Sequence, residues 1–336
     1  MHPGRGLSIQ DMVKVLDACG ARCINADYSA NLKKPTKGDF LRIPYQHYLY
    51  GSVESGFPSA MIFDTAGSDS KHVIPVFGHT FNQDLWVSNA ERSYFQIGES
   101  TRFLPSDAWL SSFLVHDDNW GSNFCCPKHF LKPLPSVVDV NASNNTTEGR
   151  VENSEWLAHV IATIPKSVKL NPLHAKAIGL DFLSAMLPHL PEDDNRWGER
   201  LIEYEQEGLI VYRPILISGR KYYEHLSRLS GWSNSGKMPK WLLEGVRSSL
   251  GDAYYWMIEM SLPELFSANF RKVGEVILRS DAEPKSSRDF NCFSLARLPG
   301  QLVVCKDMNS KSPKFEFIAS GISSHVQLFG CEDADE

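Results

Sequence analysis

The residues best suited to chemistry are one histidine and two neighbouring aspartates. His72 begins the apolar run HVIPVFG, and Asp117 and Asp118 end a second strand-like segment, WLSSFLVHDD. A nearly continuous apolar run is typical of a strand covered on both faces. A neutral imidazole can act as a base when a carboxylate fixes its tautomer. The spacing therefore permits a base and its orienting acid at the end of a sheet. The alternative is that His72 merely opens a strand and the aspartates cap a turn.

A second histidine, His79, follows His72 by seven residues. Side chains alternate between the two faces of a strand, so an odd offset places the two histidines on opposite faces. We therefore expect that His79 does not share a site with His72. It is interpreted as a surface residue or as a support for residues of the site.

Potential zinc ligands stand close together in the run HDDNWGSNFCCPKH, namely His116, Cys125, Cys126 and His129. Thiolates and imidazoles are the ligands that zinc prefers. However, no C-x-x-C module stands opposite, and adjacent cysteines ligate one ion only with strain. Two buried thiols and two exposed histidines are the favoured interpretation, and the sequence predicts no metal and no other cofactor.

Two glutamates in the C-terminal half could also form a site. Glu259 and Glu275 lie in the strand-like runs WMIEMS and VGEVIL and could face one another across a sheet, where paired carboxylates can do acid–base chemistry. Because such residues are usually solvated, we expect them on the exposed face. The aromatic run Tyr254, Tyr255, Trp256 is expected in the sheet core, and no G-x-G-x-x-G motif is present.

The composition bounds the class of protein. The chain has 336 residues, enough for about two domains, with a net charge of −6 and a pI near 6.0. This balance argues against a strongly electropositive surface for nucleic acid or anionic membranes. Seven cysteines are too few for a disulfide scaffold, and no apolar signal or membrane-spanning window is present. The sequence therefore predicts a cytoplasmic protein with reduced thiols.

Secondary-structure patterns alternate along the chain. Ser8 and Asp11 form a capping box before an amphipathic stripe, and Gly20 ends that helix. Pro214 indicates an edge or a bulge in its strand. Helices are predicted at 8–19, 45–55, 171–187, 192–207 and 218–229, and strands at 22–26, 59–63, from 72, 86–88, 109–118, 209–217, 254–260, 273–279, 302–306 and 315–319; residues 156–164 are apolar and short.

A polar stretch divides these patterns. Within residues 136–154, the run NASNNTTEGRVENS (141–154) contains no aromatic side chain and almost no core former, which is typical of a linker. The predicted organisation is a first domain at 1–135, this linker, and a mixed α+β domain of unknown role at 155–336. The predicted fold class is α+β throughout.

The first of these domains resembles a known family. A helix, a strand and a proline-containing loop precede HVIPVFG, and a strand ending in DDNWG follows. This order is similar to that of papain-like cysteine peptidases, and most of all to the bacterial branch that processes bacteriocin leaders. The resemblance implies a helix packed with an antiparallel sheet, His72 as the base, and Asp118 or, less favoured, Asp117 as the orienting acid. In this family a cysteine at the start of an early helix attacks an amide, and residues 8–20 resemble the helix that follows it.

The chain departs from the family pattern at three places. Pro75 interrupts the His72 strand, an insertion is implied around 86–102, and no cysteine stands at the start of a helix. Cys19 lies at the C-terminal end of its helix, where the dipole disfavours a thiolate, and Cys23 falls in a strand. Only seven residues precede Ser8, too few for the nucleophile helix.

Two hypotheses follow from the missing nucleophile. In the first, the protein is cysteine-peptidase-like and hydrolyses amides when a cysteine is supplied from outside this chain; without one it is an inactive relative. In the second, it is a non-catalytic module that binds a peptide or regulates a partner. Both hypotheses expect a peptide or protein partner, and neither expects nucleic acid or a membrane.

Overall fold

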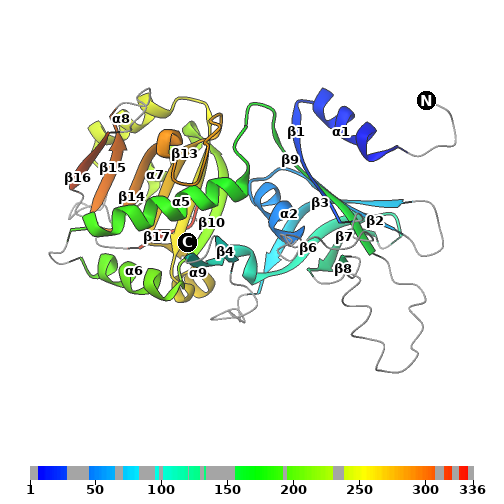
Figure 1. Cartoon of the computed structure of the whole chain (residues 1–336), viewed down its shortest axis with the longest axis horizontal. Helices are drawn as coiled ribbons and strands as arrows, with labels where there is room; N and C mark the ends of the chain where they lie inside the picture. Colours follow the sequence, from blue (N-terminus) through cyan, green and yellow to red (C-terminus); the bar gives the residue numbers. More distant parts are fainter. Residues whose placement is uncertain are drawn as a thin grey trace. The chain divides into compact units, whose positions relative to one another are not determined.

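The computed structural model describes residues 7–28, 45–64, 71–82, 95–97, 101–119, 121–128, 132–133, 156–191, 195–229, 238–306, 314–319 and 325–331. The chain divides into two compact units (Figure 1). Unit 1 comprises residues 1–81 and 110–166, and unit 2 comprises residues 82–109 and 167–336. No helix in the described part of the chain is long and apolar enough to cross a membrane.

This division differs from the predicted boundary because strand pairing crosses it. β9 (Trp156–Pro165) pairs with β1 (Ala21–Asp27) and β2 (Ser59–Asp64), and so belongs to unit 1. β5 (Thr101–Pro105) pairs with β10 (Val211–Ser218), and so belongs to unit 2. The predicted linker at 136–154 and the predicted strand at 86–88 lie outside the described residues.

The described part of unit 1 is a seven-stranded sheet with two helices. Its strand order is β1-β9-β2-β3-β6-β7, with β8 beside β9, and every pairing is antiparallel except that of β8 with β9. The elements not yet bounded are α1 (Ile9–Ala18), α2 (Tyr45–Val53), β3 (Lys71–Phe81), β6 (Leu110–Asp117), β7 (Gly121–Pro127) and β8 (Lys132–Pro133).

Helix α1 begins at the predicted capping box. Oγ of Ser8 accepts the backbone N–H of Asp11 at 3.1 Å, and the Asp11 carboxylate accepts the backbone N–H of Ser8 at 3.4 Å. These two bonds satisfy donors that the first turn of a helix leaves without partners. The predicted helix is confirmed.

Helix α2 covers one face of the unit 1 sheet. Leu49 and Tyr50 of this helix are fully buried against Met61 of β2 and Ile74 of β3. The start of the helix is tied to the residue that follows β7, since Nε2 of Gln46 donates to the carbonyl of Lys128 at 3.0 Å. The core of the described part of unit 1 therefore lies between α2 and the sheet.

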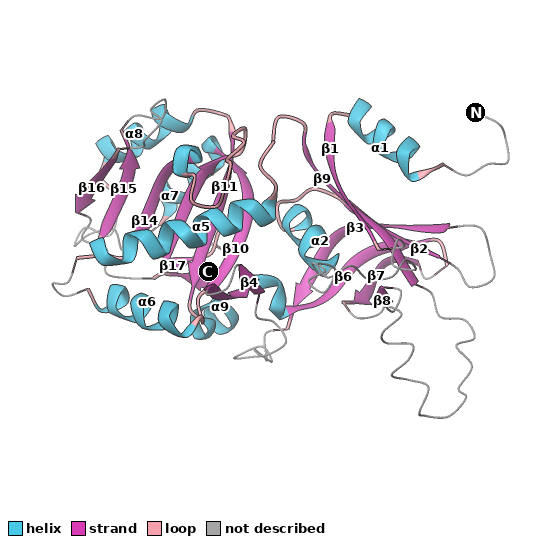
Figure 2. Ribbon diagram, viewed as in Figure 1, coloured by secondary structure: helices cyan, strands magenta, loops and turns pink. Residues whose placement is uncertain are grey.

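Unit 2 contains an eight-stranded sheet of order β16-β15-β14-β13-β11-β10-β5-β4 and a separate two-stranded sheet, β12-β17. Its remaining elements are β4 (Phe95–Ile97), α5 (Pro172–Met186), α6 (Arg196–Glu207), α7 (Gly219–Arg228), α8 (Lys240–Leu250), β11 (Tyr254–Ser261), α9 (Pro263–Asn269), β12 (Arg271–Lys272), β13 (Gly274–Arg279), β14 (Phe293–Leu298), β15 (Gln301–Cys305), β16 (Phe315–Ala319) and β17 (Val326–Gln327). Both units are thus mixed α+β, as predicted for the fold class (Figure 2).

The two faces of the larger sheet are covered by different helices. Helix α5 packs on the face that contains Ile258. Helices α7 and α8 pack on the other face, where Tyr222 and Val246 join the core formed by Met257 and Ile277. Neighbouring residues 257 and 258 point to opposite faces, as strand alternation requires. Tyr255 and Trp256 of the aromatic run are buried, as predicted, whereas Tyr254 at the start of β11 is 37% exposed.

The two prolines noted in the sequence, Pro75 and Pro214, lie where their strand has no partner on one side. Pro214 lies beyond the short stretch, Val211 and Tyr212, that pairs with β5. Pro75 comes immediately before Val76, where β3 begins to pair with β6. Since proline has no N–H to donate, a strand tolerates it where no partner strand stands on that side. Pro75 therefore does not interrupt β3, contrary to the sequence-based expectation.

Substitution of a glycine in α5 tests how closely this helix packs on the sheet, and a glycine in α8 serves as the control. A Cβ at Gly179 would lie 2.9 Å from Cγ2 of Ile258, whereas a Cβ at Gly245 in α8 would meet no atom within 4 Å. We expect Gly179→Ala to lower the free energy of unfolding by about 1–3 kcal/mol through overpacking. Gly245→Ala should raise it by about 0.5–1 kcal/mol through helix propensity. Urea denaturation of both variants measures these changes, and stabilisation by both would contradict the close packing.

Candidate functional site

The pairing of β3 with β6 brings His72 to the aspartates. The two strands run antiparallel with Val76 opposite Val115, so the start of β3 lies beside the end of β6. The chain turns directly after β6, and Asp117 and Asp118 stand at that turn. The sequence-based hypothesis of two strands meeting at one sheet end is therefore correct in its geometry.

The imidazole and the buried carboxylate are in direct contact. Nε2 of His72 lies 2.6 Å from Oδ2 of Asp117, whose side chain is fully buried, while the His72 side chain is 25% exposed. The other oxygen, Oδ1, accepts the backbone N–H of Asn119 at 2.6 Å. The ring of Phe63 contacts that of His72 edge to face, with 4.9 Å between centroids. The carboxylate of Asp117 and the ring of His72 are thus each held by a further contact.

This contact determines what the ring can do. A neutral imidazole carries one proton, and the bond to the carboxylate places it on Nε2. The lone pair is then on Nδ1, where it can accept a proton from a nucleophile. A histidine and a carboxylate arranged in this way can serve as a general base and its orienting acid.

The two aspartates differ in distance and burial. Asp118, favoured from the sequence, lies 3.4 Å from Nε2 of His72 through Oδ1 and is 82% exposed. Asp117 is both closer and buried, so the geometry favours Asp117 as the orienting residue. Ligand atoms of His72, Asp117 and Asp118 all lie within 4.8 Å of one another, a spacing that could also hold a metal ion.

The face predicted for His79 was wrong. The register of β3 on β6 shifts between Val76 and Gly78, a β-bulge that reverses the alternation beyond it. His79 consequently points to the same face as Ile74 and Val76, where it contacts α2. Its Nε2 bonds the carboxylate of Glu54, and its ring lies 5.2 Å from that of Tyr50. The signal for the bulge is Gly78, because a Cβ there would lie 2.9 Å from Cδ1 of Leu114.

The four weak zinc candidates do not converge. Cys125 and Cys126 are consecutive in β7 and point to opposite faces, so Cys125 is exposed and Cys126 is buried. His116 is exposed on β6, and His129 lies outside the described residues. No group of three potential ligands within the described ranges includes either cysteine.

The buried thiols are poorly suited to attack. Burial raises the pKa of Cys126 to about 11, and burial with the charge of Asp17 raises the pKa of Cys23. Cys19 caps the C-terminal end of α1, as predicted. A thiol is nucleophilic as its thiolate, which burial disfavours.

Unit 2 contains a second cluster, and here the prediction of solvated glutamates was wrong. Glu259 and Glu275 are directly opposite one another on β11 and β13, and both are buried. The same register continues to Arg213 on β10 and to Arg297 on β14. We call these four side chains the charge ladder.

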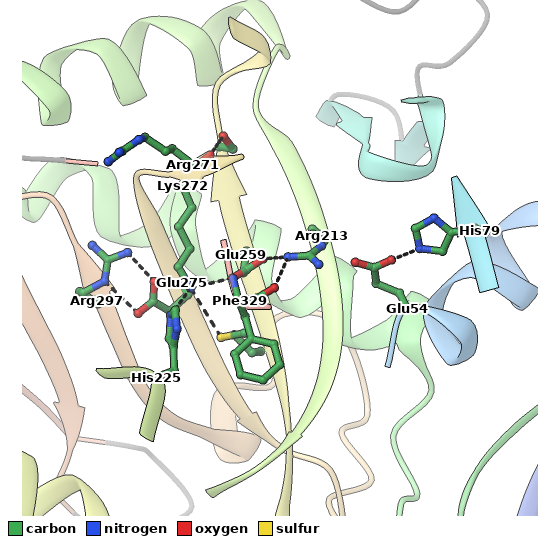
Figure 3. A network of polar contacts seen from close by, with 12 residues as sticks. Glu54, His79, Arg213, His225, Glu259, Arg271, Lys272, Glu275, Arg297 and Phe329 are labelled. Atoms are coloured by element: carbon green, nitrogen blue, oxygen red, sulfur yellow. Dashed lines mark hydrogen bonds and ion pairs between the residues drawn. The ribbon is translucent and has the colours of Figure 1, made fainter. Parts of the chain in front are cut away.

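Contacts between opposite charges run along the ladder (Figure 3). Arg213 donates to Glu259 at 2.6 Å, and Arg297 donates to Glu275 at 2.5 and 2.8 Å. Lys272 joins the two halves, with Nζ 2.6 Å from Glu259 and 3.4 Å from Glu275. Buried charges are tolerated when they are paired in this way.

The paired cations keep both carboxylates ionised. Burial by itself raises the pKa of Glu275, but the charges of Arg297 and Lys272 outweigh it and lower that pKa to about 2. At Glu259 burial also raises the pKa, but the charges of Lys272 and Arg213 outweigh it, so the pKa of this carboxyl is lowered as well. The sequence carried a signal for this cluster, a glutamate at matching places in two apolar strands, but not its burial.

Comparison with known proteins identified no similar protein. No family model matches the chain, and neither a curated protein nor a solved structure matches it. The papain-like resemblance therefore remains a hypothesis.

The His72 tautomer is directly measurable. We expect long-range ¹H–¹⁵N correlation spectra at neutral pH to show the proton of His72 on Nε2, because Asp117 accepts it. Asp117→Asn should shift the ring toward a mixture of tautomers, whereas Asp118→Asn should change the spectrum little. A proton on Nδ1 in the unmodified protein would contradict the proposed geometry.

Because the charges of the ladder are buried, we expect the loss of one of them to lower the stability of the protein strongly. Glu275→Gln leaves Arg297 and Lys272 buried with one carboxylate fewer, so we expect the free energy of unfolding to fall by about 3–5 kcal/mol. The matched change Glu224→Gln removes a surface partner of Arg220 and should cost about 0–1 kcal/mol. If denaturant titrations gave the same loss of unfolding free energy for both variants, the buried charge of Glu275 would matter no more than a surface charge, and the prediction would be wrong.

The pH dependence of the same variant follows from linkage. A carboxyl whose folded pKa is depressed stabilises the fold above its unfolded value, and this stabilisation is lost as the pH falls toward the folded pKa. For Glu275 the window runs from about 4.5 down to about 2. In this range the unmodified protein should lose stability more steeply than Glu275→Gln.

Proposed function

We propose that unit 1 is a papain-like cysteine-peptidase domain that carries the base and the orienting acid of its centre. One observation carries the proposal: Nε2 of His72 contacts the fully buried carboxylate of Asp117 at 2.6 Å. Helix α1 and the antiparallel sheet agree with the elements that the resemblance implies. The motif HVIPVFG lies wholly within β3, the strand that positions the base.

The reaction would be amide hydrolysis. A thiol gives its proton to Nδ1 of His72, and the resulting thiolate attacks the carbonyl carbon. The C–N bond breaks as the leaving amine takes that proton from His72, which leaves a thioester. Water then hydrolyses the thioester with His72 again as the base. Asp117 stabilises the imidazolium that forms twice in this sequence.

The thiol would come from outside this chain. Cys23 and Cys126 are disfavoured as thiolates by burial, and Cys19 lies at the negative end of a helix dipole. A segment upstream in the coding frame or a partner protein would supply it. Cytoplasmic conditions, which keep thiols reduced, suit this chemistry and the seven free cysteines.

A non-catalytic function is the second candidate. The same observation on the thiols favours it, because a domain without a nucleophile can still hold a peptide or regulate a partner protein. In this case His72 and Asp117 would be structural. No nucleic acid is implied by either function.

Transfer to an added thiol tests the catalytic proposal. The full chain is mixed with an activated peptide ester and a small thiol, and thioester formation is followed by mass spectrometry. We expect His72→Ala to slow the transfer about 100-fold, since a positioned base contributes about 10²–10⁴-fold. His116→Ala, which removes an exposed histidine from the next strand, is the matched control and should leave the rate unchanged.

The outcomes separate the two candidates. Equal rates for the unmodified chain and His72→Ala would overturn the catalytic proposal. If the peptide still bound with the same affinity in both, the non-catalytic module would be favoured. A cysteine codon followed by a helical apolar stripe upstream in the gene would identify the source of the thiol.

A further inference from the structure

A short C-terminal segment, residues 325–331, is held in unit 2 as an added strand. Its β17 pairs with β12, with Val326 opposite Lys272, and the backbone N–H of Leu328 donates to the carbonyl of Phe270 at 2.7 Å. The side chains of Val326 and Leu328 are buried. An extended peptide that pairs with an exposed strand in this way is a common mode of peptide recognition.

The next residue of the segment is held by charged side chains rather than by a strand. The backbone N–H of Phe329 donates to Oε1 of Glu259 at 2.8 Å, and its carbonyl accepts Nη1 of Arg213 at 3.1 Å (Figure 3). Both backbone groups of one residue are thus bound by a single ion pair. Every residue has these groups except for the N–H of proline, so the contact recognises an extended backbone and no particular side chain.

The Phe329 side chain supplies the specificity that the backbone contacts lack. Its ring lies edge to face on that of His225, with centroids 5.5 Å apart and an interplanar angle of 76°. The ring packs against the core on the face covered by α7 and α8. An aromatic side chain in such a place is the usual anchor of a bound peptide.

Contacts that do not involve the segment hold the charged groups in place. Oε1 of Glu259 is 2.6 Å from Lys272, and Oε2 is 2.6 Å from Arg213. The carboxylate therefore keeps its position when Phe329 leaves. A site whose groups are already oriented binds its ligand with less loss of entropy.

The chain turns immediately after the anchor. Gly330 has a φ of +82°, which few other residues adopt, and the N–H of Cys331 returns to the carbonyl of Leu328 at 3.1 Å. At the other end of the segment, the ring of His325 lies 4.9 Å from that of Trp197 and bonds Nη1 of Arg271 at 3.4 Å. Release of the segment needs these His325 contacts, the β17 pairing and the Phe329 contacts to open together.

We propose that residues 325–331 are a detachable internal ligand, and that Arg213, Glu259, His225 and β12 form a peptide-binding groove. Its occupant is an extended segment with the Val-x-Leu-Phe pattern of 326–329, bound in cis from this chain or in trans as a peptide. The groove belongs to unit 2 and does not depend on the function proposed for His72.

Binding in trans to the full chain tests the proposal. Phe329→Ala weakens the internal ligand, and a fluorescent peptide of residues 325–330, HVQLFG, is then titrated by fluorescence anisotropy. We expect saturable binding about tenfold tighter than to the unmodified chain, in which the tethered segment competes at high effective concentration. A peptide with alanine in place of its phenylalanine should bind about tenfold more weakly.

Two controls keep the outcome clear. Phe317→Ala removes a surface phenylalanine from β16 and should leave peptide binding as weak as in the unmodified chain. If Phe329→Ala does not fold, hydrogen exchange of the unmodified chain decides, because a detachable segment opens locally. The amides of Leu328 and Phe329 should then exchange at least tenfold faster than those of β11 and β13.

Either of two results would overturn the proposal. The first is a folded Phe329→Ala protein that binds no peptide. The second is exchange of the Leu328 and Phe329 amides only with global unfolding, at the rates of the β11 and β13 core. In that case the segment is a permanent part of unit 2.

Discussion

The candidate site depends on the pairing of β3 with β6. This pairing places a buried carboxylate, Asp117, beside the ring of His72. The ring donates a hydrogen bond to the carboxylate, and the carboxylate fixes the tautomer of the ring. A carboxylate removed from water needs donors, and His72 and the N–H of Asn119 provide them. The ring in turn has its proton held on one nitrogen, so the other is left with a lone pair. The orientation that chemistry would use is thus a consequence of satisfying a buried charge.

The charge ladder of unit 2, together with Lys272, is subject to the same constraint on a larger scale. Three cations and two carboxylates lie beneath α7, and their mutual contacts offset the free energy of removing them from water. Apolar side chains could fill the same space with similar stability. What apolar side chains cannot provide is a fixed donor and a fixed acceptor, and these are what hold Phe329. The ladder therefore connects the packing of the sheet to the docking of the C-terminal segment.

Local patterns predicted local structure well. The capping box at Ser8 and Asp11 and the cap at Asn171 each begin a helix, because these bonds are made within one turn of chain. The predictions that failed depend on distant partners. His79 was assigned to the wrong face because a bulge is defined by the opposite strand, β6. The unit boundary was misplaced because β5 and β9 pair with strands far away in the sequence.

The amino-acid sequence by itself determined the α+β class, most helices and strands, and which histidine and aspartates could form a pair. Those features follow from periodicity and from contacts between near neighbours. Only the tertiary structure decided that Asp117 is the closer acid, that Glu259 and Glu275 are buried, and that Phe329 docks on them. Burial and distance depend on which strands become neighbours. A sequence pattern shows the face that a residue prefers, but not the side chains that will stand opposite it.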